Sequence, residues 1–164
     1  MNDAVARMHP GADGAALPAS ATVAVIGAGA MGSGIAQVAA QAGHPVRLFD
    51  ARDGVAADAI EALRRRFDQL AAKGRLARDA ADAAGARLEV AASLDACADA
   101  RLVVEAIAED LAAKRALLRD LDARLAAGAI VASNTSSLSS TAIAAGSGTP
   151  ARVAGMHFFN PAPL

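Results

Sequence analysis

The sequence contains no tryptophan and no tyrosine, and only four phenylalanines and one cysteine occur among its 164 residues. A chain so poor in aromatic rings lacks the stacking platforms with which proteins hold single-stranded nucleic acids. The single cysteine, Cys97, excludes an internal disulfide and indicates a reducing compartment, for which we expect the cytoplasm. Because its neighbours are alanines and aspartates, we expect a buried, unreactive thiol there in preference to a reactive one.

An excess of charge of one sign and long apolar runs are also missing. Sixteen Lys and Arg residues stand against 17 Asp and Glu residues, which gives a net charge of −1. This balance argues against nucleic acid or an anionic membrane as the main partner. No run reaches the roughly 18 uncharged apolar residues that a membrane span needs. The hydrophobic fraction of 54% and the mean hydropathy of +0.32 instead suit the core of one α/β domain.

The first twenty residues lack the continuous apolar stretch of a signal peptide, and they contain two prolines and two glycines. We expect a flexible N-terminal extension over residues 1–20, in which His9 has no structural role. The folded domain is then expected over residues 21–164.

Short apolar runs alternate with stretches of helical periodicity along the rest of the chain. Six runs predict strands, at residues 22–26, 45–49, 88–91, 100–104, 129–132 and 152–156. Helices are predicted at 31–42, 53–73, 111–125 and 138–145, and residues 74–85 have helical propensity without a clear apolar face. Repeated βαβ units imply parallel strands with right-handed crossovers. We therefore predict an α/β, doubly wound Rossmann fold, with a mostly parallel sheet and helices on both faces.

A glycine fingerprint follows the first predicted strand and opens the first helix. It reads Gly27-Ala28-Gly29-Ala30-Met31-Gly32, with the G-x-G-x-x-G spacing of dinucleotide-binding sites. Gly27 permits a tight turn, Gly29 leaves room for a pyrophosphate, and Gly32 lets the helix pack closely. The helix N-terminus offers free N–H groups to the phosphates. We expect Gly27, Gly29, Ala30, Met31 and Gly32 to bind the cofactor; the alternative is a glycine-rich turn without a ligand.

An aspartate ends the second predicted strand, 18 residues after the fingerprint. At this place a carboxylate accepts hydrogen bonds from the adenosine ribose and repels a 2′-phosphate, so Asp50 favours NAD over NADP as the cofactor. Asp50 could also serve as a helix N-cap. Arg52 is a complication, since an arginine near this position can accept a phosphate.

Two unusual stretches follow the last two predicted strands, at residues 133–138 and 155–161, on the edge where open α/β sheets bind ligands. With them the sequence resembles the 3-hydroxyacyl-CoA dehydrogenase family from residue 22 to the end. The resemblance rests on VIGAGAMGSGIA at 25–36, LVVEAIAED at 102–110, SNTSSL at 133–138 and GMHFFNPAPL at 155–164. It implies NAD-dependent oxidation of an L-3-hydroxyacyl-CoA, such as 3-hydroxybutyryl-CoA, to the 3-ketoacyl-CoA, in fatty-acid β-oxidation or short-chain acyl-CoA metabolism.

The resemblance also assigns roles to single residues. It implies that His157 is the catalytic base, because imidazole titrates near neutral pH and can take the hydroxyl proton. Ser136 matches the serine that hydrogen-bonds the substrate oxygen beside the nicotinamide, with Ser137 as the neighbouring alternative. Asn160 matches a residue near the nicotinamide and the substrate. Without the resemblance, a packed or capping histidine and an ordinary loop serine would be the simpler interpretations.

Three further charged residues are assigned in the same way. Glu109 and Lys114 match positions that contact the cofactor beside the ribose and the carboxamide, and Lys73 matches a contact for CoA. Taken alone, the first two would be the solvated start of a helix, and Lys73 would be a cation at a helix end. The sequence suggests no metal site.

The family continues beyond the segment that ends this sequence. Its next part supplies a glutamate that orients the histidine, then a helical domain that covers the acyl group and forms the dimer interface. We therefore expect this chain to bind NAD but to turn over slowly or not at all, and we leave its oligomeric state open. Two other interpretations stay open: a dehydrogenase of a free hydroxy acid or sugar acid, and a non-catalytic NAD-binding module. The presence of His157 and Ser136 argues against the module.

Overall fold

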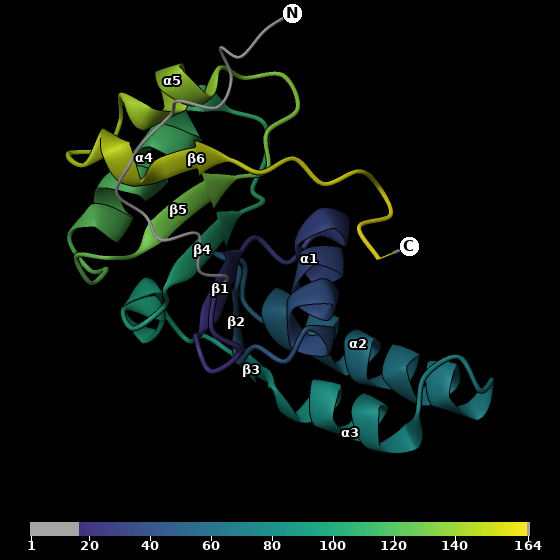
Figure 1. Cartoon of the computed structure of the whole chain (residues 1–164). Coiled ribbons are helices and arrows are strands. Elements are labelled where there is room, and N and C mark those ends of the chain that lie inside the picture. The colour runs from purple at the N-terminus through teal and green to yellow at the C-terminus, as the bar shows by residue number, and fades with distance from the viewer. Residues whose placement is uncertain (1–16, 164) are drawn as a thin grey trace, which may run out of the picture.

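The computed structural model describes residues 17–163 and shows them as one doubly wound α/β domain (Figure 1). Its strands are Val23–Ile26 (β1), Val46–Phe49 (β2), Leu88–Val90 (β3), Leu102–Glu105 (β4), Ile130–Ser133 (β5) and Val153–Gly155 (β6). Its α-helices are Ala30–Gln41 (α1), Val55–Ala72 (α2), Arg78–Ala86 (α3), Leu111–Asp122 (α4) and Ser140–Ala144 (α5). All strand pairs are parallel, in the order β3-β2-β1-β4-β5-β6. The predicted Rossmann fold is confirmed.

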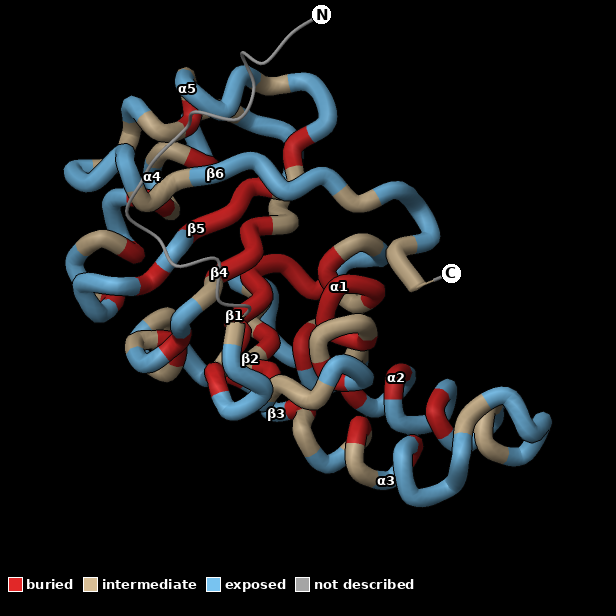
Figure 2. The backbone as a smooth tube through the Cα atoms, viewed as in Figure 1, coloured by how far each residue is buried: buried red, intermediate tan, exposed pale blue. Residues whose placement is uncertain are grey.

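The two faces of the sheet are covered by separate sets of helices. Because side chains alternate along a strand, Val23 and Val25 of β1 face one hydrophobic cluster, and Ala24 and Ile26 face the other. The first cluster includes apolar side chains of α1, α2 and α3, and the second includes those of α4 and α5. Buried residues are concentrated in the central strands and on the inner side of α1 (Figure 2). Both faces of β1 and β4 are buried, which explains their continuous apolar sequences.

The strand order brings distant loops to one edge of the sheet. β1 pairs with β2 on one side and with β4 on the other, so consecutive connections run to opposite sides at this point. The loops that follow β1, β2, β4, β5 and β6 all leave from the carboxyl ends of the strands. A crevice between the loops after β1 and β4 is the usual ligand position in such folds.

The helices follow the predicted pattern with small differences at their ends. The weakly patterned stretch at 74–85 contains all but the last residue of α3, which packs against α2 (Figure 1). Asp110 caps α4, since its carboxylate accepts a hydrogen bond of 2.7 Å from the backbone N–H of Ala113. Two 3₁₀ helices, Leu94–Cys97 and Pro150–Arg152, were not predicted, because such single turns have no apolar periodicity to find.

The N-terminal segment meets the domain earlier than expected. Leu17 packs against the first hydrophobic cluster, and the backbone N–H of Ala21 donates to the carbonyl of Pro18 at 2.8 Å. Residues 1–16, which include His9, lie outside the described part of the chain. Within residues 17–163 no helix combines the length and the apolar character needed to cross a membrane.

Candidate functional site

The glycine turn between β1 and α1 is held by close backbone approaches. Gly27 has a φ of +102°, and a Cβ at this position would lie 2.6 Å from the carbonyl oxygen of Ala106 in the loop after β4. A Cβ on Gly32 would lie 1.7 Å from the carbonyl oxygen of Gly27. Gly32 therefore permits close packing, as predicted, but first of all against the turn itself and only then against the sheet, where the Val25 side chain is 3.5 Å away.

The N-terminus of α1 is open toward the crevice. Gly29 is its N-cap residue, and within the described residues no side chain caps the helix. A Cβ on Gly29 would meet nothing within 4 Å, so this glycine borders empty space. The free N–H groups and the positive end of the helix dipole can accept an anion in this space. These features fit the pyrophosphate of a dinucleotide.

Asp50 lies at the end of β2 beside this turn, and its side chain is 7% exposed. Its carboxylate accepts a hydrogen bond of 2.9 Å from the backbone N–H of Ala28. Arg52 donates to it from its guanidinium and from its backbone N–H. The Arg52 guanidinium, together with the N–H of Ala28, holds the pKa of Asp50 well below its usual range in spite of burial. Asp50 is therefore an ionised acceptor in the position predicted for ribose recognition.

A cleft of about 980 Å³ runs along the glycine turn, and a smaller pocket of about 340 Å³ adjoins it. The cleft is bordered by Gly27, Gly29, Ala30, Asp50 and Arg52, among others. Met31, Ala106 and Ile107 line both cavities, so the two are direct neighbours. The volume of the cleft lies in the range of ligand-binding pockets in proteins.

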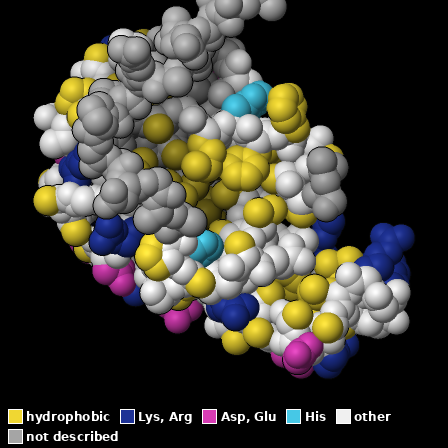
Figure 3. Space-filling view, viewed as in Figure 1, with side chains coloured by type: hydrophobic (Ala, Val, Ile, Leu, Met, Phe, Trp, Pro, Cys, Tyr) yellow, Lys and Arg dark blue, Asp and Glu magenta, His cyan; other side chains and the backbone are white. Residues whose placement is uncertain are grey.

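The smaller pocket brings together the residues assigned to catalysis. Ser136, His157, Asn160 and Glu109 line it, although they come from three different loops. His157 is exposed, and its ring lies 4.9 Å from that of Phe159, which is 77% exposed. Hydrophobic side chains also gather in the middle of the face shown in Figure 3. Within residues 17–163 no carboxylate forms a hydrogen bond or ion pair with the His157 ring.

Glu109 organises the loop after β5. Its carboxylate accepts hydrogen bonds from the hydroxyl of Thr135, from the backbone N–H groups of Ser136 and Ser137 (both 3.2 Å), and from the Ser137 hydroxyl at 3.0 Å. These bonds, above all that from Thr135, lower the pKa of Glu109 to about 2. Because the hydroxyl of Ser137 is engaged, Ser136 is the serine that remains available to the pocket.

Lys114 is buried beneath the site and does not line a cavity. Its side chain is 1% exposed, and its Nζ lies 2.6 Å from Oε1 of Glu105 and 3.3 Å from Oε2 of Glu109. Lys114 lines neither cavity, so it reaches the site through Glu109. Lys73 is also absent from both cavities and is exposed at the C-terminal end of α2. A direct cofactor contact by Lys114 and a CoA contact by Lys73 stay predictions.

Two residues near the site, Glu105 and Asn134, belong to the sequence motifs but have no role assigned from the sequence. Glu105 ends β4 and accepts hydrogen bonds from Lys114, from the Ser133 hydroxyl at 2.5 Å and from the N–H of Ile107 at 2.8 Å. Asn134 accepts a hydrogen bond of 2.7 Å from the N–H of Phe158, which joins the loops after β5 and β6. The sequence did contain a signal for Glu105, since it ends the apolar run LVVE of a buried strand. A carboxylate that is buried there needs a charged or hydrogen-bonding partner.

Comparison with known proteins decides the family. The family model described as 3-hydroxyacyl-CoA dehydrogenase, NAD binding domain, matches residues 22–164. The chain belongs to the 3-hydroxyacyl-CoA dehydrogenase family. This confirms the resemblance found in the motifs, and it confirms NAD as the cofactor.

Individual relatives of the 3-hydroxyacyl-CoA dehydrogenase family agree with this assignment. The chain is 43% identical over 143 residues to 3-hydroxyadipyl-CoA dehydrogenase of Escherichia coli K12, covering 87% of this chain and 30% of that protein. It is 42% identical over 142 residues to a probable 3-hydroxybutyryl-CoA dehydrogenase of Bacillus subtilis, covering 87% of this chain and 50% of that protein. The crystal structure of 3-hydroxybutyryl-CoA dehydrogenase from Escherichia coli K12 has a TM-score of 0.85 at 43% identity, covering 88% of this chain and 31% of that chain. The chain thus spans half or less of the length of these relatives.

Proposed function

We propose that this chain is the NAD-binding part of an enzyme that oxidises an L-3-hydroxyacyl-CoA to the 3-ketoacyl-CoA. The observation that carries the proposal is the small pocket in which Ser136, His157 and Asn160 meet, directly beside the cleft of the glycine turn. A binding module would need the cleft alone. The relatives named above, which are dehydrogenases of 3-hydroxyacyl-CoA esters, support the substrate class.

The residues of the pocket suit removal of hydrogen from a secondary alcohol. His157 takes the proton of the substrate hydroxyl, since a neutral imidazole is a good acceptor near pH 7. The hydroxyl of Ser136 donates a hydrogen bond to the substrate oxygen and holds it toward His157. Bound NAD would supply the acceptor for the hydride that leaves C3 of the substrate. Asn160, on the same loop as His157, is proposed to position the substrate against the nicotinamide.

The cofactor contacts follow the crevice from one end to the other. Gly29, Ala30 and Met31 are proposed to face the pyrophosphate at the start of α1, and Asp50 is proposed to accept the adenosine ribose hydroxyls. Glu109, whose carboxylate lines the small pocket, is proposed to border the nicotinamide ribose.

Turnover by this chain is expected to be slow. His157 is exposed, and within residues 17–163 no carboxylate contacts its ring to hold its orientation. In catalytic histidines such an orienting group contributes orders of magnitude in rate. The proposal therefore predicts weak but histidine-dependent activity together with normal cofactor binding.

Ketone reduction in the presence of NADH tests this proposal. NADH is first titrated by nicotinamide fluorescence, and NADH consumption is then followed with 3-ketobutyryl-CoA and with free 3-ketobutyrate. We expect the CoA ester to be reduced faster, and His157→Gln to lower its rate at least about tenfold without changing NADH affinity. His44→Gln is the matched control, because His44 lies outside both cavities and its ring contacts the carbonyl of Ala21. A faster rate with the free acid would favour the hydroxy-acid dehydrogenase. NADH binding without ketone reduction, both by this chain and by a form extended to the length of the relatives, would favour the module.

Three broader inferences are also proposals. The start of the domain near residue 21 is supported by the family match, which begins at residue 22, although Leu17 already contacts the core. Fatty-acid or short-chain acyl-CoA metabolism is supported by the relatives' names. A cytoplasmic location is supported by the single, free cysteine.

A further inference from the structure

Asp50 has no unused acceptor position in this structure. A carboxylate offers about four lone-pair sites, and four donors reach this one. Oδ1 accepts the backbone N–H of Arg52 at 3.0 Å and its Nε at 2.9 Å. Oδ2 accepts the N–H of Ala28 at 2.9 Å and Nη2 of Arg52 at 3.1 Å. Two hydroxyls of a ribose cannot bind Asp50 until the guanidinium of Arg52 moves away.

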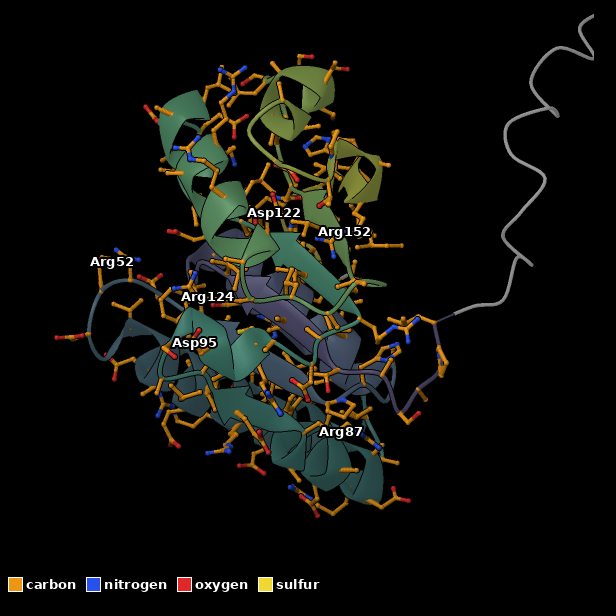
Figure 4. All side chains as sticks on the ribbon, turned by 90° about the vertical axis from the view of Figure 1, so that its left-hand side faces the viewer. Arg52, Arg87, Asp95, Asp122, Arg124 and Arg152 are labelled. Atoms are coloured by element: carbon orange, nitrogen blue, oxygen red, sulfur yellow. The ribbon has the colours of Figure 1, made fainter. Side chains whose placement is uncertain are left out.

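The side chain of Arg52 is free to make this movement. It is 70% exposed, and it belongs to the loop that leaves β2 at the rim of the domain (Figure 4). It also borders the 980 Å³ cleft. Within the described residues its guanidinium has no hydrogen bond other than those to Asp50. Rotation about its side-chain bonds therefore breaks an ion pair whose arginine is exposed and whose carboxylate is largely buried, and it leaves the hydrophobic core unchanged.

The released guanidinium stays beside the position that the ribose would take. In the closed arrangement it lies within hydrogen-bonding distance of both carboxylate oxygens, so the group bonded to Asp50 in a complex would be its neighbour. A phosphate on the ribose 2′-oxygen would meet the ionised Asp50 and be repelled. Arg52 can offset this repulsion with a forked, charge-assisted pair to the phosphate.

We propose that Arg52 is a selectivity residue of the cofactor site: it competes with the ribose of NAD for Asp50, and it pairs with the 2′-phosphate when NADP enters. The chain consequently discriminates against NADP less strongly than an aspartate alone would. This inference rests on the binding of NAD and is independent of the proposed oxidation of 3-hydroxyacyl-CoA.

Cofactor titrations of Arg52→Gln test the proposal without any enzymatic assay. NADH and NADPH are titrated into the wild type and the variant, and their binding is followed by nicotinamide emission. The chain suits this measurement, since it has no tryptophan to obscure the signal. Removal of a charge-assisted pair is expected to weaken NADPH about tenfold. NADH is expected to bind equally well or up to about fivefold more tightly, because a competing ion pair of modest strength is gone.

The matched control is Arg78→Gln. Arg78 on α3 is also an exposed arginine in ion pairs with carboxylates, Asp68 and Asp82, and it lines neither the cleft nor the small pocket. Arg78→Gln should leave the ratio of the NADPH and NADH dissociation constants unchanged. Because it also removes one positive charge, it shows whether an effect of Arg52→Gln depends on the position of the arginine or only on its charge. For Arg52→Gln, a rise of this ratio of about threefold or more supports the proposal. A smaller rise, or a fall, overturns it. A wild-type chain that binds both cofactors but reduces no ketone would count against the proposed function alone.

Discussion

The Nζ atom of Lys114 lies 2.6 Å from Oε1 of Glu105, and both side chains are almost completely buried, at 1% and 4% exposure. Glu105 ends β4 and Lys114 is the fourth residue of α4. The same carboxylate holds the hydroxyl of Ser133 at the end of β5. One buried ion pair thus joins three elements directly beneath the loops that carry the predicted catalytic residues.

Removal of the cation should destabilise the domain strongly. Lys114→Met leaves the carboxylate of Glu105 buried without its charged partner, which typically costs about 3–5 kcal/mol of unfolding free energy. Urea unfolding followed by circular dichroism measures this loss. The double variant Glu105→Gln with Lys114→Met should be less destabilised than the sum of the single variants, because neither then leaves a buried charge. Strict additivity would show that the two groups do not interact.

Substitution of the second and of the third glycine of the fingerprint should have different effects. In Gly32→Ala the new Cβ would lie 1.7 Å from the Gly27 carbonyl oxygen, so α1 must shift, at a cost of about 3 kcal/mol in stability. In Gly29→Ala the Cβ enters open space, and stability should change by less than about 1 kcal/mol. We expect this methyl group to weaken NADH binding at least about tenfold by filling the pyrophosphate position.

Gly128→Ala is the control for the glycine experiment. Its Cβ would come no closer than 3.8 Å to the Arg101 side chain, and it lies outside both cavities. Calorimetry of unfolding and fluorescence titration with NADH separate stability from binding. Unaltered NADH affinity in Gly29→Ala would exclude the pyrophosphate from this position.

The carboxylate of Glu109 should make stability depend on pH in the acid range. Its folded pKa of about 2 lies below its usual value of 4.5. Its contribution is therefore fully present above about pH 4.5 and is lost as the pH falls toward 2. Glu109→Gln should lose about 1 kcal/mol at pH 7, a figure that allows for solvent screening of a partly exposed group.

Urea unfolding of both proteins at several pH values between 7 and about 2 tests this dependence. The difference between the wild type and Glu109→Gln should shrink over the acid half of this range. A difference that stays constant down to the lowest pH would mean that the Thr135 loop does not stabilise the ionised form.

Cys97 should be unreactive in the folded protein. Its side chain is completely buried, and burial raises the pKa of its thiol to about 11. Since only the thiolate reacts, a disulfide reagent at pH 8 should label the native protein at least about a thousandfold more slowly than the urea-unfolded chain. Complete labelling of the native protein within minutes would contradict this burial.

The architecture could be predicted because its signals are local. Apolar runs such as Val23–Ile26 need burial on both sides, and Gly27 at the end of that run marks a backbone that only glycine accepts easily. The turn residue Asp50 followed from its distance along the chain to the fingerprint. For these features, neighbouring residues determine the structure.

Interactions between distant residues could not be predicted in the same way. The motif LVVEAIAED contains both Glu105 and Glu109, yet nothing in their spacing shows that one binds Lys114 and Ser133 and the other holds the loop at Thr135. The bidentate ion pair between Arg52 and Asp50 could not be predicted from the sequence either, because the side chain of an arginine two residues away can point in any direction. Such contacts depend on the tertiary fold.

The central position of β1 has a consequence for folding of the chain during its synthesis on the ribosome. Val23 pairs with Val46 on one side and with Leu102 on the other, so the first partner of β1 is synthesised soon and the second only after α2, α3 and β3. During that interval the nascent chain carries an apolar strand with one unpaired edge. We expect the arrival of β4 to be the slow, aggregation-sensitive stage of biogenesis, at which a chaperone that shields strand edges has most effect.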